Sequence, residues 1–296
     1  MIITVVAIYL CLVIVVGIFG SRLFRQTGED YFVASRSIGS FVLMMTLLGT
    51  NLTAFTMLGA SGEAYRHGVV VFGLMGASSS IIIPFLFYYL GTRSWWLGKR
   101  FSYVTQIQLI RDRYGSPALG TLLFVAVVFL MLPYILIGVK GGGDAFAAIT
   151  KGEWPGWVGS LFVCSVTFLY GRMFVVIFLA LAFVASLFTS RSIFSLGAWS
   201  LTGFSGLVSV FVGALFWKRS TKQGAGSAIV SVILLWIIFY VSSLGVEGAY
   251  SVGGTGLIPV AVIVPVSTVV LVVVSLFTRP PADADRFFPS APNDGS

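Results

Sequence analysis

The chain has 296 residues, of which 57% are hydrophobic, 15% are aromatic and only 9% are charged, and its mean hydropathy is +1.00. Soluble domains carry about 25% charged residues, so this composition excludes an ordinary soluble globular protein. The net charge of +8 does not indicate a nucleic-acid binder, because the basic residues lie between apolar runs rather than on one module. The totals predict an all-α, polytopic helical bundle in a lipid bilayer.

Nine apolar segments are expected to cross a hydrocarbon core about 30 Å thick. In chain order they cover 2–20, 38–61, 69–91, 118–142, 156–171, 173–190, 195–216, 225–244 and 256–278. Together they predict a transmembrane domain over residues 1–278. Residues 279–296 are rich in Pro, Ala, Asp and Ser, and we expect them to form a disordered cytoplasmic tail.

The basic residues test this count of spans. With nine spans, 14 of the 18 basic residues lie on one side of the membrane, and the other side has Arg66, Lys140, Lys151 and Arg191. Cytoplasmic loops carry an excess of Lys and Arg, so the N-terminus is predicted outside and the C-terminus in the cytoplasm of a cell-membrane protein. A single tilted helix over 156–190 is the alternative, but it would place the basic loop after residue 216 outside.

Small and polar residues fill the middle of the second apolar segment, where residues 47–62 read LLGTNLTAFTMLGASG. One interpretation is close packing of helices, which small and hydroxyl residues favour. The other is a discontinuous helix, whose freed carbonyl oxygens coordinate a cation near the membrane midplane. Irregular backbone at that depth requires surrounding protein or a water-filled cavity. Gly59 and Gly62 favour the break, because glycine lowers the cost of leaving helical geometry.

A short interfacial helix is expected between the third and fourth segments. There the sequence SYVTQIQLIRDRYG carries apolar residues at helical spacing, and Gly115 and Pro117 would end the helix. Arg111, Asp112 and Arg113 are interpreted as an interfacial anchor that fixes the topology.

Lys140 lies in GVKGGGD, within a helix expected over residues 118–149. Its ammonium either reaches the outer interface or faces a solute path. Pro133 is expected to kink the same helix. No Ser/His/Asp set and no paired carboxylates can be assembled in a water-excluded pocket, so the sequence does not predict an enzyme.

Two stretches carry a family resemblance. Residues 29–68 read EDYFVASRSIGSFVLMMTLLGTNLTAFTMLGASGEAYRHG, which closely resembles the opening of the sodium:solute symporter family of sodium/glucose, sodium/proline and sodium/pantothenate carriers. Residues 205–230, SGLVSVFVGALFWKRSTKQGAGSAIV, resemble the end of the tenth core helix of that family and the loop after it.

The resemblance implies an inverted-repeat transporter fold, with Na⁺ and a small-molecule solute bound where the first helix of each repeat is broken. Carried over by position, Gly49 and Leu52 would offer carbonyl oxygens to Na⁺, and Asn51 and Thr53 would brace the break. Thr56 and Gly59 would face the solute, and Lys140 is a further candidate for the solute path. Such oxygen ligands suit Na⁺ as the coupling ion.

The sequence departs from this pattern near residues 171–172. FVCSVTFLYG (162–171) resembles the end of the fourth core helix, and the next residues, RMFVVIFLALAFVASLF, resemble the ninth. By this comparison core helices five to eight are missing, and with them half of the implied ion site. The sequence predicts Na⁺-coupled uptake of a small organic solute by a shortened symporter. The alternatives are a non-transporting membrane scaffold and a sensor that binds solute without moving it.

Overall fold

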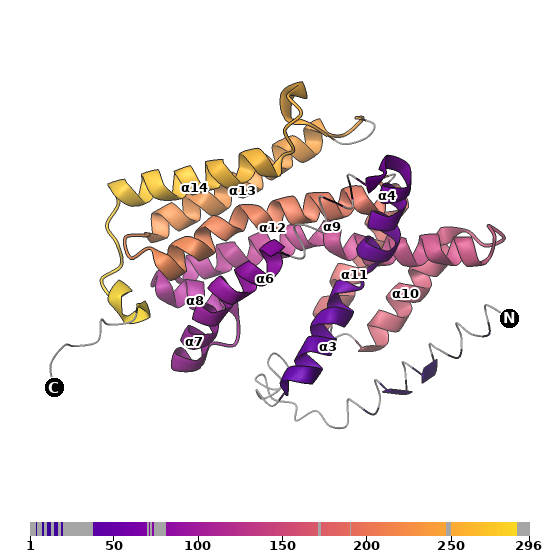
Figure 1. Ribbon diagram of the computed structural model, residues 1–296, viewed down its shortest axis with the longest axis horizontal. Coiled ribbons are helices and arrows are strands. Elements are labelled where there is room, and N and C mark those ends of the chain that lie inside the picture. The colour runs from indigo at the N-terminus through magenta and orange to yellow at the C-terminus, as the bar shows by residue number, and fades with distance from the viewer. Residues whose placement is uncertain are drawn as a thin grey trace. The chain divides into compact units, whose positions relative to one another are not determined.

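A computed structural model describes residues 38–69, 71, 73, 81–170, 173–189, 191–246 and 250–288, together with Thr4, Ile8, Cys11, Leu12, Val15, Val16 and Phe19. Every regular element in this part of the chain is helical (Figure 1). The all-α prediction is therefore confirmed.

Most of the described helices overlap the predicted apolar segments. They are α3 (Ser40–Asn51), η2 (Phe55–Ala60), α4 (Ser61–His67), α6 (Ile83–Leu86), η4 (Phe87–Gly91), α7 (Thr92–Phe101), α8 (Gln106–Arg113), α9 (Pro117–Ile149), α10 (Gly156–Tyr170), α11 (Met173–Phe188), α12 (Ile193–Phe216), α13 (Lys222–Ser242), η5 (Val252–Gly254), α14 (Val260–Phe277) and η6 (Ala284–Phe287). By length and composition, α9, α12, α13 and α14 can each cross a membrane, and the bent pair Ser40–Asn51 and Phe55–His67 makes a fifth candidate within the described residues. The chain is a polytopic helical membrane protein.

The count of nine spans stays a prediction, since most of 2–20 and much of 69–91 lie outside the described residues. Around residues 171–172 the structure has two helices, α10 and α11, which contact each other. The helix expected over 118–149 is present as α9, which includes Pro133.

The chain divides into two compact units. The first comprises Met1–Val71 and Leu132–Gly197, and the second comprises Phe72–Met131 and Ala198–Ser296. Two of the three boundaries, after residues 131 and 197, fall inside helices, so α9 and α12 each contribute residues to both units.

In the first unit, apolar side chains of α9, α11 and α12 form a small core. Its buried members are Leu136, Ile137, Val139, Leu179, Ala182, Ile193 and Leu196. Ala54 and Phe55 pack against this core, whereas α3 has no buried residue.

The core of the second unit is larger and more aromatic. It combines residues of α7, α8, α9, α12, α13 and α14 with the end of the described chain. Trp236 stacks on Tyr240, with ring centres 4.9 Å apart, and its indole N–H donates a 2.8 Å hydrogen bond to the Trp199 carbonyl. Burying a tryptophan requires such a partner for its polar edge.

The predicted interfacial helix is present as α8. Thr105 and Gln108 form a capping box at its start, in which each side chain accepts a hydrogen bond from the backbone N–H of the other residue. Gly115 has a φ of 56°, a conformation that glycine adopts at little cost, and the helix ends just before it.

The prediction that Arg113 belongs to an interfacial anchor is wrong, because its side chain is buried. Its side chain is 1% exposed and donates from Nε to the Ala214 carbonyl (3.1 Å) and from Nη2 to the Trp217 and Lys218 carbonyls (3.2 Å each). These carbonyls lie at the end of α12, where a helix leaves its last acceptors unsatisfied. Arg113 is therefore a buried cap of another helix.

The tail expected to be disordered over 279–296 stays a prediction. Within it, residues 281–288 contain the turn η6 and bury Phe287 and Phe288, which are 1% and 7% exposed. Asp285 Oδ1 also lies 2.8 Å from Lys218 Nζ. Residues 289–296 lie outside the described part of the chain.

Candidate functional site

The helix that contains the polar run is broken at Leu52. α3 ends at Asn51, helical structure resumes near Phe55, and the two segments are bent by 53°. Leu52 has φ −81° and ψ 69°, and the Thr53 N–H donates to the Asn51 carbonyl at 3.0 Å. This geometry is an inverse γ-turn centred on Leu52. The prediction of a discontinuous helix is confirmed.

The break leaves three carbonyl groups without a donor among the described residues. In an unbroken helix, the Thr53 N–H would bond to the carbonyl oxygen of Gly49. Because this N–H turns to Asn51, the Gly49 oxygen has no donor among the described residues, and the same holds for the oxygens of Thr50 and Leu52. Two of the three, those of Gly49 and Leu52, are the oxygens that the family resemblance implied as Na⁺ ligands. The next turn, η2, is a π-helix, a form often found at functional sites.

Thr56 closes the break from the other side. Its hydroxyl donates to the Asn51 carbonyl at 2.6 Å and accepts the Thr53 N–H at 3.0 Å. The side chains of Thr53 and Thr56 also lie within 3.3 Å of each other. The Asn51 amide donates back along α3 to the Leu47 carbonyl at 2.8 Å. Thr56, expected to face the solute, thus bonds across the break to the Asn51 carbonyl and to Thr53, whereas the Asn51 side chain bonds within α3.

Two glycines of other helices receive the residues that follow the break. A Cβ added at Gly141 of α9 would overlap the side chain of Ala54, and one added at Gly197 of α12 would overlap the Phe55 ring. The Phe55 ring also stacks on Phe194, with ring centres 5.6 Å apart. These packing partners were missed by the sequence reasoning, although the GGG at 141–143 marks one of them.

The remaining predicted solute-facing residues occupy different environments. Gly59 is buried against α12, where an added Cβ would lie 3.1 Å from Ile193 Cγ2 and 3.3 Å from the Phe194 nitrogen. Lys140 is partly buried, and its ammonium lies 3.9 Å from the Asp144 carboxylate on the same helix. Lys140 directly precedes Gly141, so it is next in sequence to the contact with Ala54.

Any cation at the break would bind mainly to backbone oxygens. No cluster of three or more His, Cys, Asp or Glu side chains that could hold a metal ion occurs in the described part of the chain. Neutral carbonyl and hydroxyl oxygens suit a hard, weakly charged cation, whereas the sulfur and imidazole ligands of transition metals are not gathered here.

Known proteins similar to the chain are sodium symporters or related transporters. The chain is 33% identical over 119 residues to the sodium/pantothenate symporter of Escherichia coli (strain K12), which covers 39% of the chain and 22% of the relative. It is 28% identical over 125 residues to the uncharacterized symporter YhjB of Bacillus subtilis (strain 168), a match that covers 42% of the chain and 25% of the relative. It is 26% identical over 176 residues to sodium/glucose cotransporter 4 of Danio rerio, a match that covers 57% of the chain and 25% of the relative.

The matched regions span about a quarter of the length of these relatives. No family model matches the chain, and no solved structure matches it. The relatives are named as transporters rather than enzymes, in agreement with the absence of a predicted catalytic set.

Proposed function

We propose that this chain, which the similarities to sodium symporters relate to the sodium:solute symporter family, acts in Na⁺-coupled uptake of a small organic solute. The observation that carries the proposal is the break at Leu52, where the carbonyl oxygens of Gly49 and Leu52 have no donor among the described residues. Unpaired carbonyls in an apolar segment are costly unless a cation, water or protein group satisfies them.

In this proposal Na⁺ binds to the carbonyl oxygens of Gly49 and Leu52. The side chains of Asn51 and Thr53 support these oxygens, and Thr56 joins the two ends of the break through its hydroxyl. A bound ion would stabilise one arrangement of the two helical segments. If the solute prefers the same arrangement, each ligand raises the affinity for the other, which is the basis of symport.

Lys140 remains the proposed residue on the solute path. Its only ion-pair partner among the described residues, Asp144, is 3.9 Å away, so the pair is weak enough for a solute carboxylate to compete with it. Gly59 is proposed as a position that must stay small, because its close contact with α12 keeps the second helical segment in place.

A second candidate function is that of a membrane scaffold related to these carriers. It is favoured by the resemblance itself, because core helices five to eight are missing and half of the implied ion ligands are missing with them. The break supplies only the other half. On this alternative the break is a structural feature retained without a complete ion site.

Binding of ²²Na⁺ to the purified protein separates the two candidates. We expect wild type to bind Na⁺ in preference to K⁺. Thr56→Val, which keeps the shape and removes the hydroxyl that closes the break, should weaken binding by about fivefold to a hundredfold, because two hydrogen bonds of about 0.5–1.5 kcal/mol each are lost. The matched control is Thr50→Val, whose hydroxyl only donates to the Thr46 carbonyl within α3.

Wild-type protein that binds no Na⁺ would refute the carrier proposal and leave the scaffold. If Na⁺ binds, vesicles with an inward Na⁺ gradient can be tested for uptake of radiolabelled pantothenate and glucose, the solutes named in the relatives. Equal loss of binding in both threonine variants would show that the break does not hold the ion.

A further inference from the structure

Arg93, at the start of α7 in the second unit, has an incompletely paired guanidinium group. Its Nε and Nη2 atoms are enclosed and have no hydrogen-bond partner in the described structure. The guanidinium carbon lies 4.8 Å from the centre of the Phe216 ring and 5.0 Å from that of Phe288. The rings attract the cation, but enclosed N–H groups of native proteins normally have an acceptor as well. Among the described residues, no anion pairs with this positive charge.

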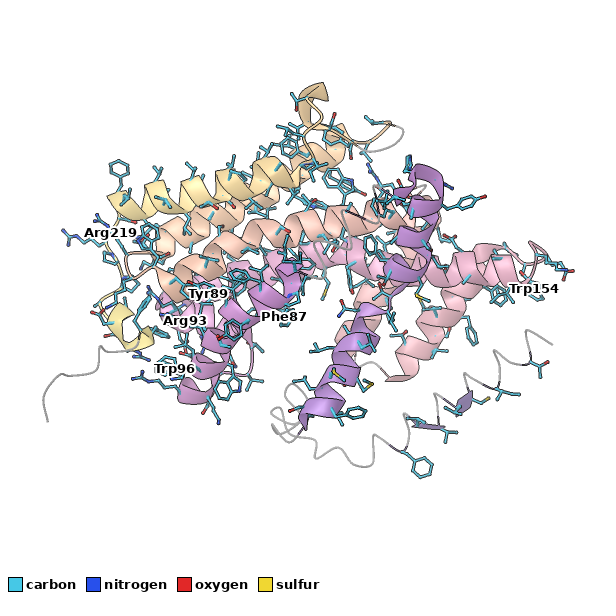
Figure 2. All side chains as sticks on the ribbon, in the orientation of Figure 1. Phe87, Tyr89, Arg93, Trp96, Trp154 and Arg219 are labelled. Carbon is cyan, nitrogen blue, oxygen red and sulfur yellow. The ribbon has the colours of Figure 1, made fainter. Side chains whose placement is uncertain are left out.

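A pocket of about 470 Å³ opens beside this charge. It is lined by Tyr88, Tyr89, Thr92, Arg93, Trp96 and Phe216. Figure 2 shows Tyr89, Arg93 and Trp96 in succession along the helical run of α6, η4 and α7. Of the three guanidinium nitrogens, Nη1 is the one that is not enclosed, so it can reach a ligand in the pocket.

An exposed aromatic strip leads away from Arg93. The Phe85 ring stacks on Tyr89 with ring centres 6.0 Å apart, and Tyr89 stacks on Phe216 at 4.6 Å. Phe85 is 63% exposed and Tyr89 is 51% exposed. The surface therefore offers apolar contact at one end and a cation at the other, which matches an amphiphile with a negative head.

The surroundings of the pocket are typical of a membrane interface. Lys99 Nζ lies 4.8 Å from the Trp95 ring, and the Arg100 guanidinium lies 5.1 Å from the Trp96 ring. Tryptophan and basic residues are enriched where a helix meets the lipid headgroups. From residue 64 to residue 111 the sequence contains no Asp or Glu, so no acidic side chain of this stretch competes for Arg93.

We propose that Arg93 binds the phosphate of an anionic phospholipid, and that an acyl chain of this lipid lies along Tyr89 and Phe85. The basic residues place this end of the second unit at the cytoplasmic leaflet by the positive-inside rule, and that leaflet carries the anionic lipids. All residues of this site belong to the second unit, whereas the break at Leu52 belongs to the first.

Native mass spectrometry of the full chain tests the site. The protein is reconstituted in phosphatidylcholine with a minor fraction of phosphatidylglycerol, released into detergent, and the retained phosphatidylglycerol is counted. Arg93→Gln should lower the affinity for phosphatidylglycerol about tenfold, the effect of losing one charge-assisted hydrogen bond. Lys99→Gln removes the same charge from the same helix and should lower it much less. An equal loss in both variants would indicate general surface charge and overturn the proposal.

Two further measurements do not depend on a variant. A phosphatidylglycerol probe with a photoreactive acyl chain should label wild-type protein within residues 85–96, and labelling confined to other regions would refute the site. Equal labelling by a matched phosphatidylcholine probe would exclude selectivity for an anionic head. Displacement of phosphatidylglycerol by excess inorganic phosphate would identify a site for free phosphate instead of lipid.

Discussion

In both units a side chain satisfies carbonyls where a helix stops, but the two side chains differ. In the first unit the helix is interrupted at Leu52, and the exposed hydroxyl of Thr56 donates to a carbonyl next to the interruption. In the second unit α12 ends at Phe216, and the buried guanidinium of Arg113 donates to its last carbonyls. A neutral hydroxyl forms hydrogen bonds worth about 1 kcal/mol each, so the arrangement at Leu52 can change at moderate cost. A buried cation with three acceptors is far more expensive to displace.

The broken helix of the first unit is also less buried than the helices of the second unit. α3 has no buried residue among the described atoms, whereas α13 buries six, including Ala228, Val232 and Trp236. Buried contacts raise the free energy of local unfolding, and regions that move in function come from the less stable end of that range. We therefore interpret the second unit as the rigid part of this chain and the broken helix as its adaptable part.

The strongest test of this comparison is to remove the cap on α12. Arg113→Met keeps most of the side-chain volume but leaves the carbonyls of Ala214, Trp217 and Lys218 without their donor. We expect a loss of about 3 kcal/mol of stability, in the range for buried hydrogen bonds to a charged group. Thermal unfolding of the detergent-solubilised protein, followed by loss of the monodisperse peak, measures the effect.

The matched control is Arg111→Met on the same helix. Arg111 is 48% exposed at its side chain and pairs with Asp112 at 2.8 Å, and an exposed ion pair contributes less than about 1 kcal/mol. Equal destabilisation by the two variants would show that Arg113 acts as one more surface charge, and the contrast between rigid and adaptable regions would fail.

A second, smaller effect is expected at the packing of the broken helix. In Gly141→Ala the new methyl group would overlap Ala54, whose Cβ is fixed by the backbone, so the segment after the break must shift. Overpacking of this kind costs about 1–3 kcal/mol. Gly138→Ala lies one turn earlier on α9 with no atom within 4 Å of the added Cβ, and it should stabilise the protein by about 0.5–1 kcal/mol, because alanine favours the helix. ²²Na⁺ binding and thermal unfolding of both variants test this, and a Gly141→Ala protein equal to wild type in both would contradict the packing role.

The position of the break was predictable because its cause is local. Glycine, asparagine and threonine in a run that otherwise reads as a membrane helix indicate backbone that leaves the helix, and the resemblance at 29–68 pointed to Gly49 and Leu52. The glycines that receive Ala54 and Phe55 were not predictable, because Gly141 and Gly197 lie far away in sequence and only the fold brings them to the break.

The burial of Arg113 and that of the two tail phenylalanines have the same cause, which is contact with residues distant in sequence. Local charge and composition place Arg113 at the interface and give little sign that residues 281–288 pack. Burial of Arg113 depends on carbonyls about 100 residues away in α12, which no local pattern reveals. In the tail, the adjacent Phe287 and Phe288 were the available signal, since two neighbouring large apolar side chains are unusual in a segment that stays in solvent.

The smallest expected effect is a pH dependence at α8. Burial, followed by the charge of Asp112 and a hydrogen bond to it, raises the pKa of Tyr103 to about 12. In the unfolded chain the phenol loses its proton near pH 10. The unfolded state is therefore favoured as the pH rises from 10 towards 12, and the stability contributed by the neutral phenol is lost in that window.

Tyr103 is only partly buried, so solvent screens the effect and we expect a modest change. The unfolding temperatures of wild type and Tyr103→Phe should differ by a constant amount below pH 10, and that of wild type should fall relative to the variant between pH 10 and 12, while Tyr65→Phe at an exposed position should follow wild type. Parallel curves for wild type and Tyr103→Phe would mean that α8 is not held closed around this phenol, and the rigid character assigned to the second unit would then rest on Arg113 and the aromatic core.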